Sequence, residues 1–410
     1  MFKQSFKAVL LILMLNSVQA DEGYPDIKFG GLVDLRAAHT DNTTSWLDHG
    51  LGKTRYGGSD GDSQVVGHVA EAALLIAAHF NWSTSGQLYL KYDADQHHPL
   101  DIVEGFISYR PVASGAYRFT GRVGAFFPPV SFENSGPAWT SPYSITPSAI
   151  NTWVGEEMRT LGGEGALQWL GEEQRVSLSG ALYKANDPTG SLLAWRGWTI
   201  HDFKTGLNDR VPLPPTHSIG PGGDFRMQAP WVEPFHEIDG RLGYYSALNW
   251  ERPGTFKTRA LYYDNRADPT AFNGTQYAWH TRFSSLGVQY ALPADIELIT
   301  QYLRGDTFMG SMVQGVRVDF SSWYLLLSKR LDRQRFTLRY DLFDVKDIID
   351  VEYNEHGHAW TLAYALEVTD RQRLMLEFLD ITSDHPQRGD LGLPAVAGEQ
   401  LIQASYRLFF

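Results

Sequence analysis

Apolar and polar residues alternate along most of the chain after residue 26. In the first such segment Ile27, Phe29, Val33 and Leu35 share one side, and the other side is mostly polar. The same period of two returns in segment after segment, through to the last one, which ends at Phe410. Alternation of this kind is typical of a β-strand with one apolar and one polar face. The sequence therefore predicts an all-β protein.

The alternating segments are sixteen in number. We expect strands at 26–37, 65–80, 86–93, 100–110, 116–127, 160–169, 174–184, 238–250, 255–263, 279–290, 295–304, 315–328, 333–343, 358–367, 371–382 and 400–410. Tight turns alternate with longer connections, of which 128–159 and 185–237 are the longest. This order is typical of a transmembrane antiparallel β-barrel with short periplasmic turns and long external loops. We expect residues 21–410 to form one barrel domain.

The first twenty residues have the pattern of an export signal. Lys3 and Lys7 precede the apolar run Ala8–Leu15, and small residues stand before Asp21. The apolar run is too short to cross a bilayer as a helix. We therefore expect residues 1–20 to be a cleavable signal peptide, with cleavage before Asp21.

Aromatic residues end many of the predicted apolar faces. At one end of the barrel we expect a girdle of Phe80, Tyr109, Trp169, Trp250, Tyr290 and Phe410, and at the other end Tyr92, Phe127, Tyr262 and Tyr302. Amphipathic rings favour the two interfaces of a membrane. Ordinary core packing at strand ends is the alternative, and the alternation of loop lengths favours the girdles.

The last eight residues run from Gln403 to Phe410 and alternate apolar or aromatic residues up to the final phenylalanine. This ending resembles the C-terminal signal of Gram-negative outer-membrane proteins, although Ser405 stands where glycine is usual. Together with the signal peptide and the loop pattern, the chain resembles sixteen-stranded porins of the phosphate-selective and substrate-porin type. The resemblance implies a bacterial outer-membrane location. It also implies that the third external loop, 128–159, folds into the lumen and constricts it.

Charged residues on the faces opposite the apolar ones are expected to line the pore. The candidates are Arg110, Arg118, Arg122, Arg259, Arg317, Arg335 and Arg339 on the strands, with Glu156 and Glu157 on the third loop. Two interpretations stay open. These residues form a basic track that guides anions past the loop acids, or they form ion pairs that stiffen a wet wall. The fourth loop, 185–237, is rich in aromatic residues, which we expect to pack the loop down rather than stack on solutes.

Composition and motifs exclude several kinds of function. The chain has 410 residues, no cysteine, and 35 Lys+Arg against 47 Asp+Glu, for a net charge of −12. This balance argues against a nucleic-acid partner, and the lack of cysteine excludes disulfides and thiol catalysis. Ser59 lies in a G-x-S-x-G pattern, but without the strand and helix that a nucleophile elbow needs. His97 and His98 are adjacent, a spacing that rarely presents both rings to one metal ion. We expect no enzyme activity, metal or cofactor.

The sequence favours an outer-membrane porin that passes small hydrophilic solutes, anions among them, by passive diffusion. The expected partners are those solutes and the outer-membrane lipid or lipopolysaccharide. Both a homotrimer and a monomer stay open. The alternatives are a non-channel barrel that serves as an adhesin or structural anchor, a lipid-hydrolysing enzyme, and a soluble secreted β protein.

Overall fold

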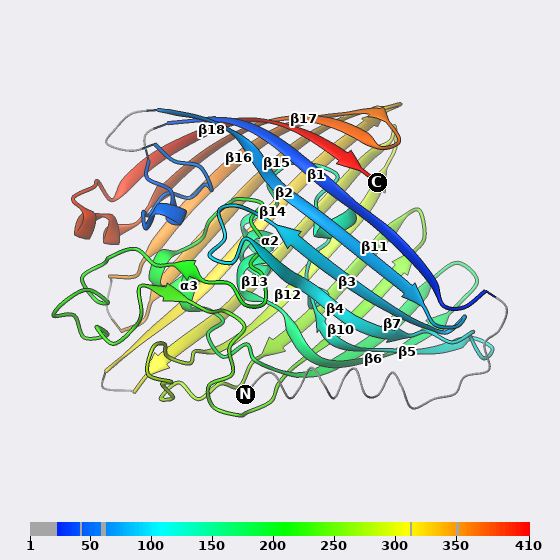
Figure 1. Cartoon of the computed structure of the whole chain (residues 1–410), viewed down its shortest axis with the longest axis horizontal. Coiled ribbons are helices and arrows are strands. Elements are labelled where there is room, and N and C mark those ends of the chain that lie inside the picture. Colours follow the sequence, from blue (N-terminus) through cyan, green and yellow to red (C-terminus); the bar gives the residue numbers. More distant parts are fainter. Residues whose placement is uncertain (1–22, 42, 59–62, 312–313, 350–351) are drawn as a thin grey trace.

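The computed structural model describes residues 23–41, 43–58, 63–311, 314–349 and 352–410. The predicted signal peptide lies outside these residues. The chain forms a closed antiparallel barrel of sixteen strands, shown in Figure 1. The barrel strands are β1 (Asp26–Thr40), β2 (Gln64–His79), β3 (Thr84–Tyr92), β4 (Leu100–Tyr109), β5 (Tyr117–Phe126), β6 (Thr160–Leu170), β7 (Arg175–Lys184), β10 (Gly243–Arg252), β11 (Phe256–Asp264), β12 (His280–Leu292), β13 (Ile296–Gly310), β14 (Gly315–Leu331), β15 (Gln334–Asp347), β16 (Glu355–Thr369), β17 (Gln372–Asp384) and β18 (Val396–Phe409). Each of the predicted strands is confirmed, with shifted ends.

The first and last strands close the barrel. β1 pairs with β18 in antiparallel register, from Leu32 opposite Phe409 to Thr40 opposite Leu401. The main chain of Phe410 extends this pairing, because its N–H donates to the Gly31 carbonyl at 3.2 Å and its carbonyl accepts from the Gly31 N–H at 3.1 Å. Closure leaves no unpaired strand edge, which is the condition for a sheet to exist in lipid.

The predicted apolar faces form the outer wall. Phe29 and Leu35 are exposed by 66% and 47%, whereas Asp34 and Arg36 between and beside them are buried. Exposed apolar side chains recur on the outward positions of the other strands. A continuous apolar exterior on a closed barrel is the surface that a membrane covers. The structure therefore shows a barrel of the transmembrane type.

Aromatic residues occur at both ends of this apolar surface. Tyr109, Trp250, Tyr290 and Phe410 are exposed at the end that carries the short turns, which we call the periplasmic end. Tyr92 and Tyr262 are exposed near the external ends of β3 and β11, at the end that carries the long loops, and Tyr302 is exposed at the middle of β13. The prediction for Phe127 was wrong. Because the chain turns inward after β5, this ring is buried and stacks on Trp139 with 4.1 Å between ring centroids.

Two long external loops carry most of the remaining structure. The third loop, 127–159, contains a 3-10 turn (Pro137–Trp139) and helix α2 (Ala149–Glu157). The fourth loop, 185–242, contains helix α3 (Ser191–Arg196) and a two-stranded hairpin, β8 (Val211–Pro212) and β9 (Trp231–Val232). Shorter 3-10 turns lie at Trp46–Asp48 and Pro386–Leu391. No helix among the described residues is long and apolar enough to span a membrane.

β10 begins at Gly243, five residues later than the predicted start at 238. The reason is a turn held by Asp187, whose carboxylate accepts hydrogen bonds from the N–H groups of Ile238 and Asp239. These two N–H groups are therefore unavailable for a strand ladder, and the fourth loop extends to residue 242.

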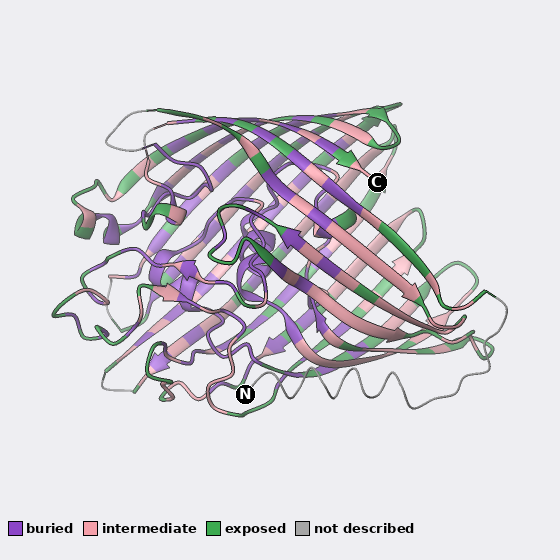
Figure 2. Ribbon diagram, viewed as in Figure 1, coloured by how far each residue is buried: buried purple, intermediate pink, exposed green. Residues whose placement is uncertain are grey.

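The hydrophobic core lies inside the barrel, between the two long loops and the inner wall. Trp153 of α2 packs edge-on against Trp198 of the fourth loop and against Phe283 and Phe320 of the wall. Figure 2 shows buried residues gathered on the loops within the barrel. The aromatic residues of the fourth loop that are buried are Trp195, Trp198, Phe203, Phe225 and Phe235. This confirms that they pack the loop down, although they pack against the barrel interior rather than in a separate core.

Barrel closure depends on a glycine at the seam. A Cβ on Gly31 would clash with the carbonyl oxygen of Ala73 and lie 2.6 Å from the ring of Phe410. We therefore expect Gly31→Ala to lower the free energy of unfolding by about 1–3 kcal/mol, the usual cost of overpacking. Denaturant unfolding in detergent, followed by circular dichroism, measures the effect. The matched control is Gly67→Ala on β2, where a Cβ meets nothing within 4 Å. Equal stability of the two variants would contradict the prediction.

Candidate functional site in the filled lumen

Charged side chains of the wall hold the backbone of the third loop. Arg339 on β15 donates hydrogen bonds to the carbonyl oxygens of Thr146 at 2.7 Å and Pro147 at 3.0 Å. Glu377 on β17 accepts from the N–H groups of Ile145 at 2.6 Å and Thr146 at 3.1 Å. A loop inside a barrel loses water around its backbone, so each polar group needs another partner. The wall supplies these partners.

The same loop is held at its beginning and at its helix. Arg259 on β11 donates to the Pro129 carbonyl at 2.5 Å. Asp341 on β15 accepts from the N–H of Ala149 at 3.2 Å, the first residue of α2. The side chain of Ser148 caps this helix by accepting from the N–H of a residue in its first turn. A carboxylate beside a helix N-terminus is favourable because of the free N–H groups there.

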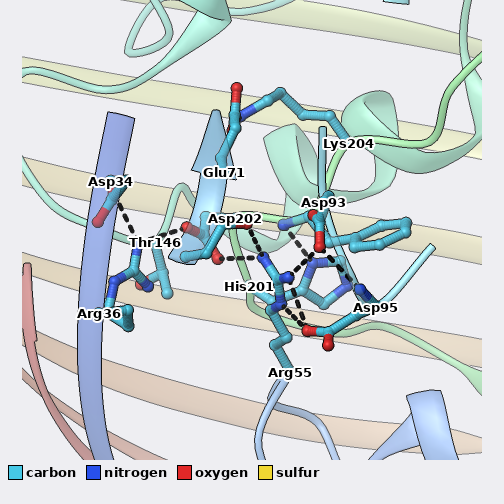
Figure 3. A network of polar contacts seen from close by, with 12 residues as sticks. Asp34, Arg36, Arg55, Glu71, Asp93, Asp95, Thr146, His201, Asp202 and Lys204 are labelled. Atoms are coloured by element: carbon cyan, nitrogen blue, oxygen red, sulfur yellow. Dashed lines mark hydrogen bonds and ion pairs between the residues drawn. The ribbon is translucent and has the colours of Figure 1, made fainter. Parts of the chain in front are cut away.

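Residues 197–209 of the fourth loop, which we call the lumen segment, cross the barrel interior next to the third loop. Asp202 at its centre lies between two arginines, as Figure 3 shows. Its carboxylate is 2.7 Å from Arg36 of β1 and 3.8 Å from Arg55 of the first external loop. Lys204 forms an ion pair with Glu71 of β2 at 2.5 Å. The lumen segment is therefore attached through its own charged side chains.

These charges form one connected network. Arg55 also binds Asp93 at 2.5 Å and Asp95 at 2.7 Å, both in the second external loop. Lys91 on β3 lies 3.3 Å from Asp93. Burial raises the pKa of Asp202, but the neighbouring arginines outweigh it and hold the pKa well below its ordinary value. Asp202 is therefore ionised at neutral pH.

Glu156 and Glu157 connect α2 to the fourth loop. Glu156 binds Arg196 at 2.7 Å and His201 at 3.0 Å. Burial opposes its ionisation, but Arg196 prevails and lowers the pKa of Glu156 to about 2. Glu157 accepts from the N–H of Leu192 at 3.0 Å in the first turn of α3, while burial raises its pKa to about 7. Neither residue faces the predicted basic track, because both side chains bind residues of the fourth loop instead.

Five of the seven predicted arginines lie on the inner wall. Arg118 and Arg122 on β5 and Arg335 on β15 are half-buried near the periplasmic end. Arg122 pairs with Glu164 at 2.9 Å, and Arg335 lies 3.6 Å from Glu297. Arg259 is also on this wall. Arg339 is fully buried and pairs with Asp341 at 2.7 Å.

Two predicted positions are corrected. Arg110 is exposed and follows the last residue of β4, so it lies at a periplasmic turn. Arg317 faces outward on β14, because the alternate residues Val318 and Phe320 are buried against the loops inside the barrel. The inner wall is apolar at this height, since Trp153 and Trp198 pack there. The sequence pattern of β14 was assigned to the wrong face in this half of the strand.

The lumen is filled around its whole circumference at the height of the two loops. Every barrel strand contributes at least one buried inward side chain, namely Arg36, Glu71, Lys91, Asp101, Phe126, Thr160, Tyr183, Tyr245, Tyr263, Phe283, Gln301, Phe320, Arg339, Thr361, Glu377 and Gln403 in chain order. Between the third loop and the lumen segment lies a cavity of about 10 Å³, whose lining includes Trp139, Asp202 and Lys204. This volume holds about one water molecule. Near the periplasmic end, in contrast, the charged inner side chains of Arg122, Glu164, Arg335 and Glu297 are partly exposed.

One cluster could in principle bind a cation. Oxygen atoms of Asp187, Glu237 and Asp239 lie within 4.8 Å of one another, the only such group found among the described residues. Their oxygens accept backbone N–H bonds that shape the fourth loop, which accounts for the cluster without an ion. His97 and His98 pack edge-to-face with each other and are not part of it. Ser59 lies outside the described residues.

Sequence reasoning did not identify the central network. Arg36 lies on the polar face of the first predicted strand, so the sequence could have predicted that its side chain points into the barrel. Arg55, Asp202 and Lys204 lie in external loops, and no local pattern shows that these loops enter the barrel.

Comparison with known proteins shows the fold. No family model matches the chain, and no curated protein matches its sequence. Among solved structures, the outer-membrane channel DcaP of Acinetobacter baumannii is similar with a TM-score of 0.59 and 11% identity, over 95% of this chain and 99% of that one. An anion-selective porin from Comamonas acidovorans is similar with a TM-score of 0.52 and 13% identity, over 94% and 99%. OmpF of Salmonella typhi, in complex with daunomycin, has a TM-score of 0.52 and 11% identity, over 95% and 100%. The chain therefore has the barrel fold found in outer-membrane porins.

The contribution of the wall residues that bind the third loop can be tested at Arg339. Arg339→Gln leaves the buried carboxylates of Asp341 and Glu133 without their cation. We expect the free energy of unfolding to fall by about 3–5 kcal/mol, as for other broken buried pairs. The control is Arg335→Gln, four residues away on the same face, whose ion pair is partly exposed and should contribute at most about 1 kcal/mol. Denaturant unfolding in detergent measures both, and similar losses would contradict the prediction.

Proposed function

We propose that the protein is an outer-membrane channel for the passive diffusion of small hydrophilic solutes. The observation that carries this proposal is the asymmetric lumen. Part of its wall near the periplasmic end, on β5, β6, β13 and β15, carries partly exposed charged side chains, whereas two loops fill its external half. A barrel that served only as an anchor has no need for an ionic vestibule. The likeness to solved porins supports the proposal through the fold.

The third loop is proposed as the fixed constriction of this channel. Its backbone is bound to β11, β15 and β17 by side chains of the wall. These bonds set its position at the middle of the lumen. A solute would pass beside it, so the width left between this loop and the opposite wall determines what can enter.

The direct test is single-channel recording of the detergent-purified protein in a planar bilayer. The filled lumen predicts discrete openings separated by long closed periods, rather than one steadily open level. Folded protein that shows neither openings nor uptake of small sugars in liposomes would overturn the channel function. Such a result would favour the alternative of a structural or adhesive barrel, which the filled external half also fits.

The mass of the detergent-solubilised complex distinguishes a monomer from a homotrimer.

We propose no enzymatic activity and no cofactor. Ser59 of the G-x-S-x-G pattern lies outside the described residues, and the proposal is supported by the likeness to porin barrels. Contact of the outer wall with lipid or lipopolysaccharide is proposed from its apolar surface and aromatic ends.

The selectivity of the vestibule can be predicted from its ion pairs. Arg118 has no ion-pair partner among the described residues, whereas the charge of Arg122 is offset by Glu164. We therefore expect Arg118→Ala to reduce anion preference more than the double variant Arg122→Ala/Glu164→Ala, because only the first removes net positive charge from the pore. The reversal potential in a potassium chloride gradient measures this. The opposite order, or no change in either variant, would contradict it.

A further inference from the structure

We propose that the lumen segment, residues 197–209, is a displaceable gate that closes the channel in the present structure. This inference rests on the proposed channel function. It assigns the closed state to one segment of the fourth loop and leaves the third loop as the immobile part of the constriction.

The first argument is the position of the segment. It occupies the space between α2 and the wall formed by the first four strands. The N–H of Leu207 donates to the carbonyl of Ile102 on β4 at 2.8 Å. On the other side, the hydroxyl of Thr152 in α2 donates to the carbonyl of His201 at 3.0 Å. The segment therefore fills the gap beside the constriction through which a solute would pass.

The second argument is that the two arginines bound to Asp202 keep other carboxylates when the segment leaves. Arg36 would retain Asp34, at 2.9 Å, after losing Asp202. Arg55 would retain its carboxylates in the second external loop, at 2.5 and 2.7 Å. Glu71 would retain the hydroxyl of Tyr89 after losing Lys204. Withdrawal of the segment thus leaves both arginines paired, whereas Glu71 loses its only cation among the described residues and Asp101 of β4 loses its two hydrogen bonds from Asn208. These two carboxylates face the space that the segment would vacate, where water would replace the lost partners.

The third loop differs in this respect. Glu377 and Arg259 bind its backbone, and neither has an ion-pair partner among the described residues. Their other side-chain contacts are to the neutral groups of Gln403 and Asn249. Removal of the third loop would therefore leave a buried carboxylate and a buried guanidinium poorly compensated. The two loops are adjacent in space, yet only the departure of the third would leave an arginine of the wall without a carboxylate.

The third argument concerns the ends of the segment. Gly197 follows α3 with φ of 76°, a conformation that glycine adopts without strain. Gly206 lies near the other end. Positions that absorb a change in backbone angles are what a hinged segment needs.

Outside the barrel, water would solvate Asp202 and Lys204. A passage lined by Arg36, Glu71 and other polar groups would then open into the vestibule.

A disulfide lock tests this gate. The native chain has no cysteine, so an introduced pair has no competing thiol. A Cβ on Gly206 would lie 2.5 Å from the Cβ of Asp101 on β4, and a disulfide needs about 3.8 Å, so a shift of about 1 Å allows the bond. We expect the oxidised Asp101→Cys/Gly206→Cys protein to open at least ten times less often than the same protein after reduction. The single variant Asp101→Cys should not respond to the reductant.

A second variant weakens the closed state. Asp202→Asn with Lys204→Gln removes the two charges by which the segment forms ion pairs with the wall, and we expect at least a tenfold rise in open probability. The matched control is Arg210→Gln with Glu233→Gln, which removes an ion pair of 2.9 Å beside the β8–β9 hairpin of the same loop. This control should behave like the unmodified protein. Circular dichroism and heat-dependent migration in gels confirm that each barrel is folded.

The outcomes separate the gate from the channel. If the locked protein, with its disulfide confirmed by mass, conducts like the reduced protein, the proposed gate is wrong and the proposed channel function is unaffected. If the folded charge variant and the reduced cysteine protein are both silent, the channel function itself fails. Closure by oxidation, reopening by reduction, and frequent opening of the charge variant together support the gate.

Discussion

The structure depends on one constraint: no backbone N–H or C=O can be left unpaired where water is absent. On the outside this constraint requires a closed sheet, and the seam from β1 to β18 provides it. On the inside, sixteen strands enclose a space that side chains from opposite walls cannot fill. Two loops fill its external half, and their irregular backbones need partners in turn. The charged inner wall supplies those partners, so the lumen chemistry follows from the same constraint as the barrel.

The buried charges therefore have two different roles. Arg339, Arg259 and Glu377 bind main-chain groups and define where the third loop lies. Asp202 and Lys204 instead bind other charged side chains. Buried ion pairs contribute little net stability compared with apolar packing, because desolvation offsets the attraction. Their effect here is positional, and the apolar cluster around Trp153 supplies the favourable packing.

The sequence alone allowed the strands of the barrel to be predicted, but not the arrangement of the loops inside it. Period-two alternation is a local property, and strands with one lipid-facing side must show it, so all the strands and the loop order could be predicted. The position of a loop is set by contacts distant in sequence. For this reason Glu156 was assigned to a basic track, whereas it binds Arg196 and His201. Phe127 and Arg317 were misplaced for the same reason, since both depend on how the loops fill the upper lumen.

The cover of the third loop decides what an arginine of β15 does. Arg335 and Arg339 share one face of β15, four residues apart, and the sequence offers no reason to separate them. The first is partly exposed near the periplasmic end, where water screens its charge and solutes can reach it. The second is sealed beneath the third loop, where its donors are used by carbonyl groups and Asp341. Only partly exposed charges, such as that of Arg335, can act on a solute in the closed state. A buried arginine, such as Arg339, affects permeation by fixing the position of a loop. Arg36 is buried in the closed state and would become exposed to solutes if the lumen segment withdrew.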